Sequence, residues 1–363
     1  MQLRGIKRAT IMGGGVALAV AVAACSSSSS PAAGGSSSPS SGSGSSSLSG
    51  TLNASGSTFQ TNFQQAAISA FKSLYPNVTV NYGGGGSGKG RSDLASGTVN
   101  FAGSDSPIPS SETSSFAGKT VLYFPVQIGP IAIAYNLSGV SSLKLDSATL
   151  AGIFSGKITK WNDSAIKALN SGVSLPSEAI SPVVRSDSSG TTANFSNFLV
   201  QSAGSAWTLG TSSTIKWPSS FKAANGGSGV AQAVKSTAGA IGYVDFSTAT
   251  ASSLTAASIK NKDGDFVAPS TAGANAAASQ VTPKADLTFS TVWQAGATSY
   301  PITYQSWDLV YAKQPNANDA KLLQAYLGYL LGDGQQLLSQ INLAALPSSI
   351  DSLAKAQLSK ITS

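Results

Sequence analysis

The sequence predicts an α/β fold with more than one hydrophobic core. Strand-like segments, in which apolar and polar residues alternate, are interleaved with segments of helical periodicity, and this order is typical of α/β proteins. The chain has 363 residues, and a single core rarely grows beyond roughly 250 to 300 residues, so two domains are expected. Short loops rich in glycine and hydroxyl residues join strands to helices at several points.

The start of the chain has the pattern of an export signal. Basic residues precede an apolar run over residues 11–24, and this run is shorter than the roughly 20 residues that span a bilayer. Residues 1–24 are therefore expected to be a signal peptide rather than a transmembrane helix. The run Val22-Ala23-Ala24-Cys25 resembles a bacterial lipobox, which implies a lipid on Cys25. An ordinary signal peptide with a stray cysteine is the alternative.

Residues 25–50 are expected to form a flexible tether. Residues 26–49 are almost purely Ser, Gly, Pro and Ala, a composition that cannot bury a core. Together with a lipid on Cys25, this predicts an exported protein anchored to the outer face of the cell membrane.

Each predicted element after the tether follows from its own apolar pattern. Strand-like stretches begin at Leu52 and cover 78–82, 99–103, 121–136, 179–185 and 240–246. Helical spacing is found over 58–74, 91–94, 147–154, 163–169, 191–200 and 230–235, and from residue 316 to the end the chain is expected to be mostly helical. Pro125 and Gly129 are expected to interrupt the stretch 121–136, because proline cannot donate a ladder hydrogen bond and glycine weakens a strand.

Composition argues against several classes of function. The chain has no histidine and one cysteine, which excludes Ser-His-Asp and Cys-His catalysis and the commonest transition-metal sites. The net charge of +7 becomes 7 − 3 = +4 without the three basic residues of the signal peptide, and it is too small and too scattered for a nucleic-acid surface. We therefore expect no enzyme, no metal, no cofactor and no nucleic-acid partner.

One loop has the composition of an oxyanion site. Arg185, one of two arginines after residue 25, precedes Ser186-Asp187-Ser188-Ser189-Gly190-Thr191-Thr192 and a helical pattern. A guanidinium, hydroxyl groups and the free N–H groups of a helix N-terminus can together hold a small oxyanion without a metal. An ordinary Ser/Thr/Asp helix cap is the commoner use of such a run.

Two further loops share this design. Ser55-Gly56-Ser57-Thr58-Phe59 and Gly83-Gly84-Gly85-Gly86-Ser87-Gly88 each offer glycines that let the backbone approach a ligand, followed by a hydroxyl at a helix start. The second loop nearly spells a P-loop, but Gly90 stands where that motif needs Ser or Thr. Ser87 also fails as a G-x-S-x-G nucleophile, because Lys89 replaces the last glycine and no histidine is present.

At this point the chain resembles a known family, the phosphate-binding subunit (PstS-like) of bacterial phosphate ABC importers. The matching segments occur in the order typical of the family and cover roughly residues 51–350. They include Ala54-Ser55-Gly56-Ser57-Thr58-Phe59, Phe101-Ala102-Gly103-Ser104-Asp105, Ile153-Phe154-Ser155-Gly156-Lys157-Ile158-Thr159-Lys160-Trp161-Asn162-Asp163, Val184-Arg185-Ser186-Asp187-Ser188-Ser189-Gly190-Thr191 and Gly239-Ala240-Ile241-Gly242-Tyr243-Val244-Asp245.

The resemblance implies a type II periplasmic-binding-protein fold, in which two α/β lobes are joined by two crossover segments and phosphate binds in the cleft between them. It implies lobe 1 over 51–126 and 301–363 and lobe 2 over 127–300, with hinges near 126–129 and 300–303. It also implies a monomer that captures inorganic phosphate by hinge closure. The closed form would dock on a membrane permease driven by a cytoplasmic ATPase.

Carried over position by position, the resemblance also implies the phosphate contacts. These are Thr58, the Phe59 backbone N–H, Ser87 and Asp105 from one lobe, and Arg185, Ser189, Gly190 and Thr191 from the other. Asp187 would orient the Arg185 guanidinium. The sequence departs from the family around Ser87, where the loop is richer in glycine, and whether Lys89 or Arg91 adds a contact stays open.

Asp105 is unexpected beside an anion, because two like charges about 4 Å apart repel by roughly 4 kcal/mol at an effective dielectric of 20. The carboxylate makes sense if the ligand brings a proton. Hydrogen phosphate can donate an O–H to Asp105, whereas sulfate at neutral pH cannot. The alternative is a plain turn residue before Pro107. Trp161, Trp217 and Tyr243 are expected to pack the lobes rather than hold the ligand.

Three other functions stay open at this stage. The ligand could be another oxyanion such as sulfate or molybdate, although Asp105 argues against an unprotonated one. The chain could be an exported phosphatase or phosphoesterase, for which the missing histidine is the counter-evidence. It could also be a surface adhesin or signalling scaffold.

Overall fold

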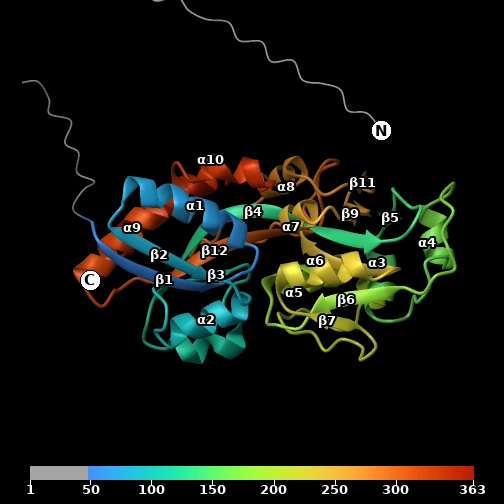
Figure 1. Ribbon diagram of the computed structural model, residues 1–363, viewed down its shortest axis with the longest axis horizontal. Helices are drawn as coiled ribbons and strands as arrows, with labels where there is room; N and C mark the ends of the chain where they lie inside the picture. Colours follow the sequence, from blue (N-terminus) through green and yellow to red (C-terminus); the bar gives the residue numbers. More distant parts are fainter. Residues whose placement is uncertain (1–47) are drawn as a thin grey trace, which may run out of the picture. The chain divides into compact units, whose positions relative to one another are not determined.

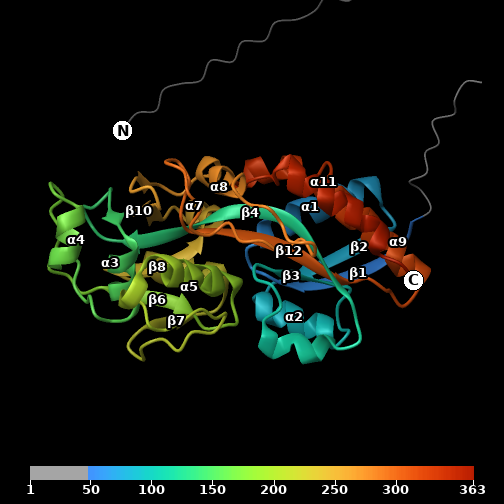
Figure 2. The same ribbon diagram turned by 180° about the vertical axis from the view of Figure 1, so that it is seen from behind.

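The structure is a computed structural model that describes residues 48–363. The expected signal peptide, Cys25 and nearly all of the expected tether lie outside the described residues. Within 48–363, no helix has the length and apolar character needed to cross a membrane. The arrangement of these residues is shown from two sides in Figures 1 and 2.

Strands and helices alternate as the sequence predicts, and the strands build a long mixed sheet with the order β2-β1-β3-β12-β4-β8-β6-β7 and β9 beside β4. Its strands are β1 (Gly50–Gly56), β2 (Val78–Gly83), β3 (Phe101–Ser104), β4 (Val121–Asn136), β6 (Ser181–Arg185), β7 (Lys222–Ala224), β8 (Ala240–Asp245), β9 (Thr255–Ala256) and β12 (Thr303–Tyr311). A small second sheet contains β5 (Lys144–Leu145), β10 (Ser258–Lys260) and β11 (Phe266–Val267).

The long strand β4 divides this sheet into two halves. It pairs with β12 as far as Pro130, and from Ile131 onward it pairs with β8. On one side, β1 is parallel to β2 and β3; on the other, β6 is parallel to β7 and β8. We call the half with β1, β2 and β3 and its helices lobe 1, and the half with β6, β7 and β8 and its helices lobe 2.

Helices cover both halves of the sheet. They are α1 (Thr61–Leu74), α2 (Ser87–Ala95), α3 (Ser147–Phe154), α4 (Ser164–Leu169), α5 (Gly190–Ser202), α6 (Gly226–Ser236), α7 (Phe246–Ala251), α8 (Thr271–Ala278), α9 (Ala317–Leu331), α10 (Gln335–Leu338) and α11 (Ser348–Gln357). In both views α2 lies on one side of strands β1 to β3, and α1 and α9 lie on the other (Figures 1 and 2). Strand β1 therefore contacts α2 on one face and α9 on the other, whereas alternate residues of the edge strand β2 are exposed.

The helix predicted from the leucine and tyrosine spacing near the C-terminus is present as α9. The side chain of Asn316 accepts a hydrogen bond from the Asp319 N–H and so caps its first turn, and Gly332 follows its last residue. Its apolar residues face the core, with Leu322, Leu323, Tyr326, Leu327, Leu330 and Leu331 all fully buried.

The expected interruption of residues 121–136 was wrong, because β4 is one continuous strand. The register shifts where Trp307 pairs with Pro125 and Ser306 pairs with Gln127, so Pro125 borders a bulge, which is one of the places where a sheet tolerates proline. Position 129 requires glycine because Tyr304 packs against it: a Cβ on Gly129 would lie 2.8 Å from Cε1 of Tyr304.

Several elements differ from the sequence-based expectation. The strand β12 and the helix α8 were not predicted. The first helix begins at Thr61 rather than at residue 58, and α2 begins at Ser87, inside the glycine-rich loop. Residues 58–60 after β1 therefore form a turn before the helix, and Ser87 stands in the first turn of a helix.

Candidate anion-binding site

Three loops of similar composition follow the ends of parallel strands. The loop after β1 leads to α1, the loop after β2 leads to α2, and the loop after β6 leads to α5. The first N–H groups of a helix have no carbonyl partner within the helix, so each loop delivers free donors together with its hydroxyl groups. The structure brings the beginnings of α2 and α5 together although they belong to different lobes.

Gly190 shows how closely the two lobes approach. A Cβ built on Gly190 would lie 2.5 Å from Oγ of Ser87 and 2.7 Å from Oδ2 of Asp105. Only a glycine fits at this position, because a real Cβ does not come so close to other atoms. The first turn of α5, which contains Gly190 and Thr191, therefore faces Ser87 and Asp105 directly.

Further hydrogen bonds cross between the lobes. The Gly88 N–H donates to the Ser188 carbonyl oxygen at 3.0 Å. The Gly227 N–H donates to Oγ1 of Thr58 at 3.3 Å. The side-chain amide of Asn194 in α5 donates to the carbonyl oxygen of Asp105 at 2.7 Å. The lobes are thus in direct contact around the site.

Asp105 is the carboxylate of this site and is only 2% exposed. Ser57 and Ser306 each donate a hydroxyl hydrogen bond to Oδ1 at 2.6 Å, and Ser87 donates a longer one to Oδ2 at 3.4 Å. Burial raises the pKa of Asp105, while the hydrogen bonds from Ser306 and Ser57 and the charge of Arg185 oppose that rise. Asp105 is therefore a buried carboxyl group whose oxygens accept hydrogen bonds from three serine hydroxyls.

Arg185 supplies the positive charge and is held from two sides. Its Nε donates to Oδ1 of Asp187 at 2.7 Å, and its Nη2 pairs with Oδ2 of the same carboxylate. Its Nη1 donates to Oγ1 of Thr191 at 3.1 Å. Burial alone would raise the pKa of Asp187, but the hydrogen bonds and the charge of Arg185 outweigh it and lower that pKa. The Asp187 carboxylate is therefore charged at neutral pH.

The remaining sequence-predicted residues lie in the same region. Ser189 is fully buried and caps α5 by accepting the Thr192 N–H at 3.2 Å. The Phe59 N–H donates to Oγ of Ser57 at 3.1 Å, and that hydroxyl in turn donates to Asp105. The structure therefore brings together all eight residues for which a phosphate contact is expected, together with Asp187.

Sequence reasoning missed several members of this cluster. They are Ser57, Asn194, Gly227, Gln305 and Ser306. Ser57 belongs to the loop Ser55–Phe59, which the sequence predicts to bind an anion, so its hydroxyl could have been predicted as part of the site. Ser306 and Gln305 lie on β12, a strand that the apolar pattern did not reveal, and no signal in the sequence points to them.

The two cations left open by the sequence are paired outside this cluster. Lys89 forms an ion pair with Asp93 at 2.6 Å and its side chain is half exposed. Arg91 is fully buried and donates to Glu112 through Nε at 2.7 Å and through Nη2 at 2.9 Å. Its Nη1 also donates to the hydroxyl of Ser104, just before Asp105. Arg91 therefore supports the turn that carries Asp105.

The aromatic residues pack the lobes, as expected. Trp161 is fully buried and donates its indole N–H to the Gly239 carbonyl oxygen at 3.0 Å. Tyr243 is also fully buried, and its hydroxyl accepts the backbone N–H of Arg185 at 3.2 Å. Trp217 lies against Tyr243, with ring centroids 6.1 Å apart. Tyr243 thus helps to position the strand end that carries Arg185.

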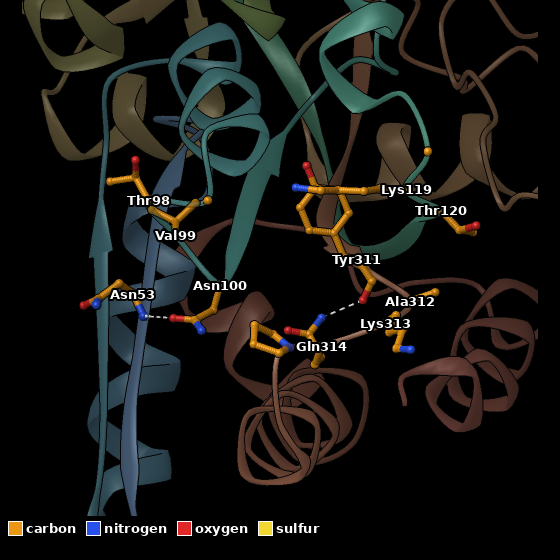
Figure 3. Close-up of a pocket in the computed structure, with 13 residues that line it drawn as sticks. Asn53, Thr98, Val99, Asn100, Lys119, Thr120, Tyr311, Ala312, Lys313 and Gln314 are labelled. Atoms are coloured by element: carbon orange, nitrogen blue, oxygen red, sulfur yellow. Dashed lines mark hydrogen bonds between the residues drawn. The ribbon is translucent and has the colours of Figure 1, made fainter. Parts of the chain in front are cut away.

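Surface hollows do not by themselves indicate this site. A pocket of about 790 Å³ lies where β3 begins and β12 ends, away from Asp105, and is lined by residues such as Asn100, Lys119 and Tyr311 (Figure 3). A smaller groove of about 360 Å³ has Asp105, Asn194 and Gln305 among its lining residues. Within residues 48–363, no group of three or more His, Cys, Asp or Glu side chains could hold a metal ion.

Comparisons of sequence place this chain among known proteins. A family model described as a PBP superfamily domain matches residues 41–333. Phosphate-binding protein PstS 3 of Mycobacterium leprae (strain TN) is 39% identical over 312 residues, which are 83% of this chain and 84% of that protein. Phosphate-binding protein PstS 2 of Mycobacterium tuberculosis (strain ATCC 25618 / H37Rv) is 35% identical over 323 residues, or 86% and 87% of the two chains.

Solved structures agree with the architecture. A high affinity periplasmic phosphate-binding protein (PfluDING) bound with phosphate has a TM-score of 0.71 at 22% identity, covering 85% of this chain and 94% of that one. A phosphate-binding protein from Stenotrophomonas maltophilia has a TM-score of 0.69 at 20% identity, with the same coverage of 85% and 94%. These likenesses confirm the type II periplasmic-binding-protein fold with two α/β lobes. By its sequence, the chain belongs to the PBP superfamily and, within it, to the family of PstS phosphate-binding proteins.

Proposed function

We propose that this protein captures inorganic phosphate between its two lobes and delivers it to an ABC-type phosphate import permease. One observation carries the proposal: Ser87 and Asp105 of lobe 1 face the first turn of α5 in lobe 2, and a Cβ on Gly190 would lie 2.5 Å from Oγ of Ser87. Donors from both lobes and one buried acid thus converge at a single point. Relatives named phosphate-binding proteins support the choice of phosphate.

In this proposal the binding residues act from both sides of the anion. The hydroxyl groups of Thr58, Ser87, Ser189 and Thr191 and the N–H groups of Phe59, Gly190 and Thr191 donate hydrogen bonds. Arg185 supplies the positive charge and Asp187 keeps its guanidinium in place. Bonds from N–H and guanidinium groups to a charged phosphate are stronger than bonds between neutral groups. Such a site holds a tetrahedral oxyanion without a metal.

Asp105 gives the site its preference for a protonated oxyanion. Its carboxylate accepts hydroxyl groups on the protein side, and it can also accept the O–H of hydrogen phosphate. Sulfate brings no proton and would place two acceptors against each other. Leaving a buried acceptor pair unsatisfied separates otherwise similar ligands by large factors.

Closure of the lobes links binding to delivery. We assign lobe 1 to residues 51–126 and 301–363 and lobe 2 to residues 127–300, with hinges near 126–129 and 300–303. Contacts such as Gly88 to Ser188 would belong to the closed form, and phosphate would favour that form because it touches both lobes only there. The closed form then docks on the permease, which a cytoplasmic ATPase drives.

The first 50 residues complete the proposal. Residues 1–24 act as a signal peptide, Cys25 carries the lipid, and residues 25–50 form the tether, so the monomer works at the outer face of the cell membrane. No bond of phosphate is made or broken, and no cofactor takes part. Labelling cells with a radioactive fatty acid such as palmitate tests the anchor, because a Cys25→Ser variant should lose the label and be released.

Titration calorimetry of the purified protein tests the binding function. Phosphate should bind with one site per chain, and excess sulfate should not displace it. Phosphate that releases no heat and does not raise the melting temperature would refute the proposal, since a ligand at 100 times its Kd should add about 2.7 kcal/mol of stability. Hydrolysis of a chromogenic phosphoester by the protein would indicate an enzyme instead.

A further inference from the structure

Asp245 is a second buried carboxylate near the site, and the binding scheme above does not use it. It ends β8 and caps α7, where its Oδ1 accepts the Thr248 N–H at 2.7 Å. Its Oδ2 has no hydrogen-bond partner among residues 48–363, although the residue is only 2% exposed. A buried carboxylate oxygen without a partner is costly while the group is charged.

Gly227 of the same lobe lies against this carboxylate, and residues of the opposite lobe lie beside Gly227 and the start of α7. A Cβ on Gly227 would lie 3.3 Å from Oδ2 of Asp245 and 3.7 Å from Oγ1 of Thr58, and the Gly227 N–H donates to the same Thr58 hydroxyl. Two residues after Asp245, the hydroxyl of Ser247 accepts a hydrogen bond from the side-chain amide of Asn62 at 3.0 Å. Thr58 and Asn62 belong to lobe 1, so lobe 1 is in contact with residues that lie next to Asp245.

No free cation compensates Asp245 from the elements packed around it in the described part of the chain. The titratable and charged groups on these elements are Asp105 after β3, Tyr304 on β12 and the Arg185–Asp187 pair after β6. The other groups are neutral: Asn62 on α1, Gln127 on β4 and Gly227 on α6. The one cation among them, Arg185, is already paired with Asp187. Burial is the main cause that raises the pKa of Asp245 to about 6, and the charge of Asp105 adds to it.

We propose that Asp245 is a further residue of the phosphate site, which takes up a proton when the two lobes close. The inference rests on the proposed function, because it requires the lobes to close around phosphate. When they open, Thr58 and Asn62 move away and water can solvate the carboxylate, which then ionises like an ordinary aspartate. Closing buries the unpaired oxygen again, and a proton removes its charge.

This mechanism makes phosphate affinity depend on pH in one direction. The pKa of Asp245 lies at about 6 in the closed form, against an ordinary value of 3.8. The gain in affinity is therefore fully present below the ordinary value and is lost as the pH rises through about 6. Between pH 8 and pH 5, protonation of Asp245 therefore raises the affinity for phosphate by about tenfold.

Calorimetric titration of phosphate into the wild-type protein and an Asp245→Asn variant at pH 5, 6, 7 and 8 tests the inference. The ratio of the two Kd values at each pH cancels the titration of phosphate itself. From pH 8 to pH 5, the phosphate affinity of the wild type should rise about tenfold relative to that of Asp245→Asn, since the amide cannot take up a proton. An Asp245→Ser variant, which keeps a capping oxygen for α7, should behave like the amide.

Asp308→Asn is the matched control. Burial raises the pKa of Asp308 to about 7, but its partner Gln64 belongs to the same lobe, so closure should not change its environment. Its Kd ratio to the wild type should not vary with pH. A constant ratio for both Asp245 variants would overturn the inference and leave Asp245 as a helix cap. If the wild type bound no phosphate at any pH, the proposed function would fail first, and the inference with it.

Discussion

Gly88 and Ser188 join the two lobes backbone to backbone, because the N–H of Gly88 donates to the carbonyl oxygen of Ser188 at 3.0 Å. The contact requires glycine, since a Cβ on Gly88 would overlap the side chain of Ser188. The glycine-rich loop that resembles a P-loop therefore has a different use. It lets the start of α2 approach the loop that precedes α5.

A Gly88→Ala substitution should weaken phosphate binding by roughly ten- to a hundredfold, because overpacking at such a contact costs about 1–3 kcal/mol. The free energy of unfolding should change little if the clash arises only on closure. Gly83→Ala is the control, since a Cβ at that position would come no closer than 3.8 Å to another atom. Equal Kd values for Gly88→Ala and the wild type would show that phosphate does not require this contact.

Arg185 should tolerate no replacement. Its guanidinium binds the Asp187 carboxylate through two nitrogens and Thr191 through a third, a geometry that lysine cannot reproduce. Both Arg185→Lys and Arg185→Ala should raise the Kd for phosphate by more than about a hundredfold, because alanine leaves the buried Asp187 carboxylate without its cation and lysine keeps the charge but loses the planar set of donors. Lys89→Gln serves as the comparison, since Lys89 is half exposed and pairs with Asp93, and calorimetry should show almost unchanged affinity.

Replacing Asp105 by Asn should lower the selectivity for phosphate over sulfate more than it lowers the affinity for phosphate. The amide can donate to sulfate, so competition titrations should show the preference for phosphate over sulfate falling by at least about tenfold. Sulfate binding should improve while phosphate binding weakens. An unchanged preference in Asp105→Asn would mean that Asp105 does not discriminate between the two anions.

Asp308 should make the stability of the protein depend on pH. Burial raises its pKa from 3.8 to about 7, so the folded state binds a proton that the unfolded state releases. This contribution to stability is fully present below the unfolded pKa and is lost as the pH rises through about 7. It amounts to a few kcal/mol, because one pKa unit corresponds to about 1.4 kcal/mol.

Urea denaturation at pH 4.5, 6 and 8 measures this effect. As the pH rises from 4.5 to 8, the free energy of unfolding of the wild type should fall relative to that of Asp308→Asn, because the amide of the variant does not titrate. Parallel stability curves for the two proteins would show that the Asp308 carboxyl has the same pKa in the folded and unfolded states.

Local chemistry allowed part of this molecule to be predicted from the sequence. The capped helix α9, the strand over residues 240–246 and the loop that begins at Arg185 depend mainly on neighbours in the chain, and the structure has all three where they were expected. Hydroxyl groups, glycines and arginine can be recognised as anion ligands from their type and order alone. Resemblance to a family then connected loops that local patterns cannot relate to one another.

Tertiary structure alone decided the rest. Strand β12 carries the buried polar residues Gln305, Ser306 and Asp308, so its sequence lacks the alternation by which a strand is recognised, yet it lies at the centre of the sheet. Its polar groups are paired by partners far away in the chain, such as Asp105 for Ser306. The sequence thus determined which groups could bind an anion. Long-range packing determined which of them meet, because a buried polar group is stabilised only by partners that folding brings to it.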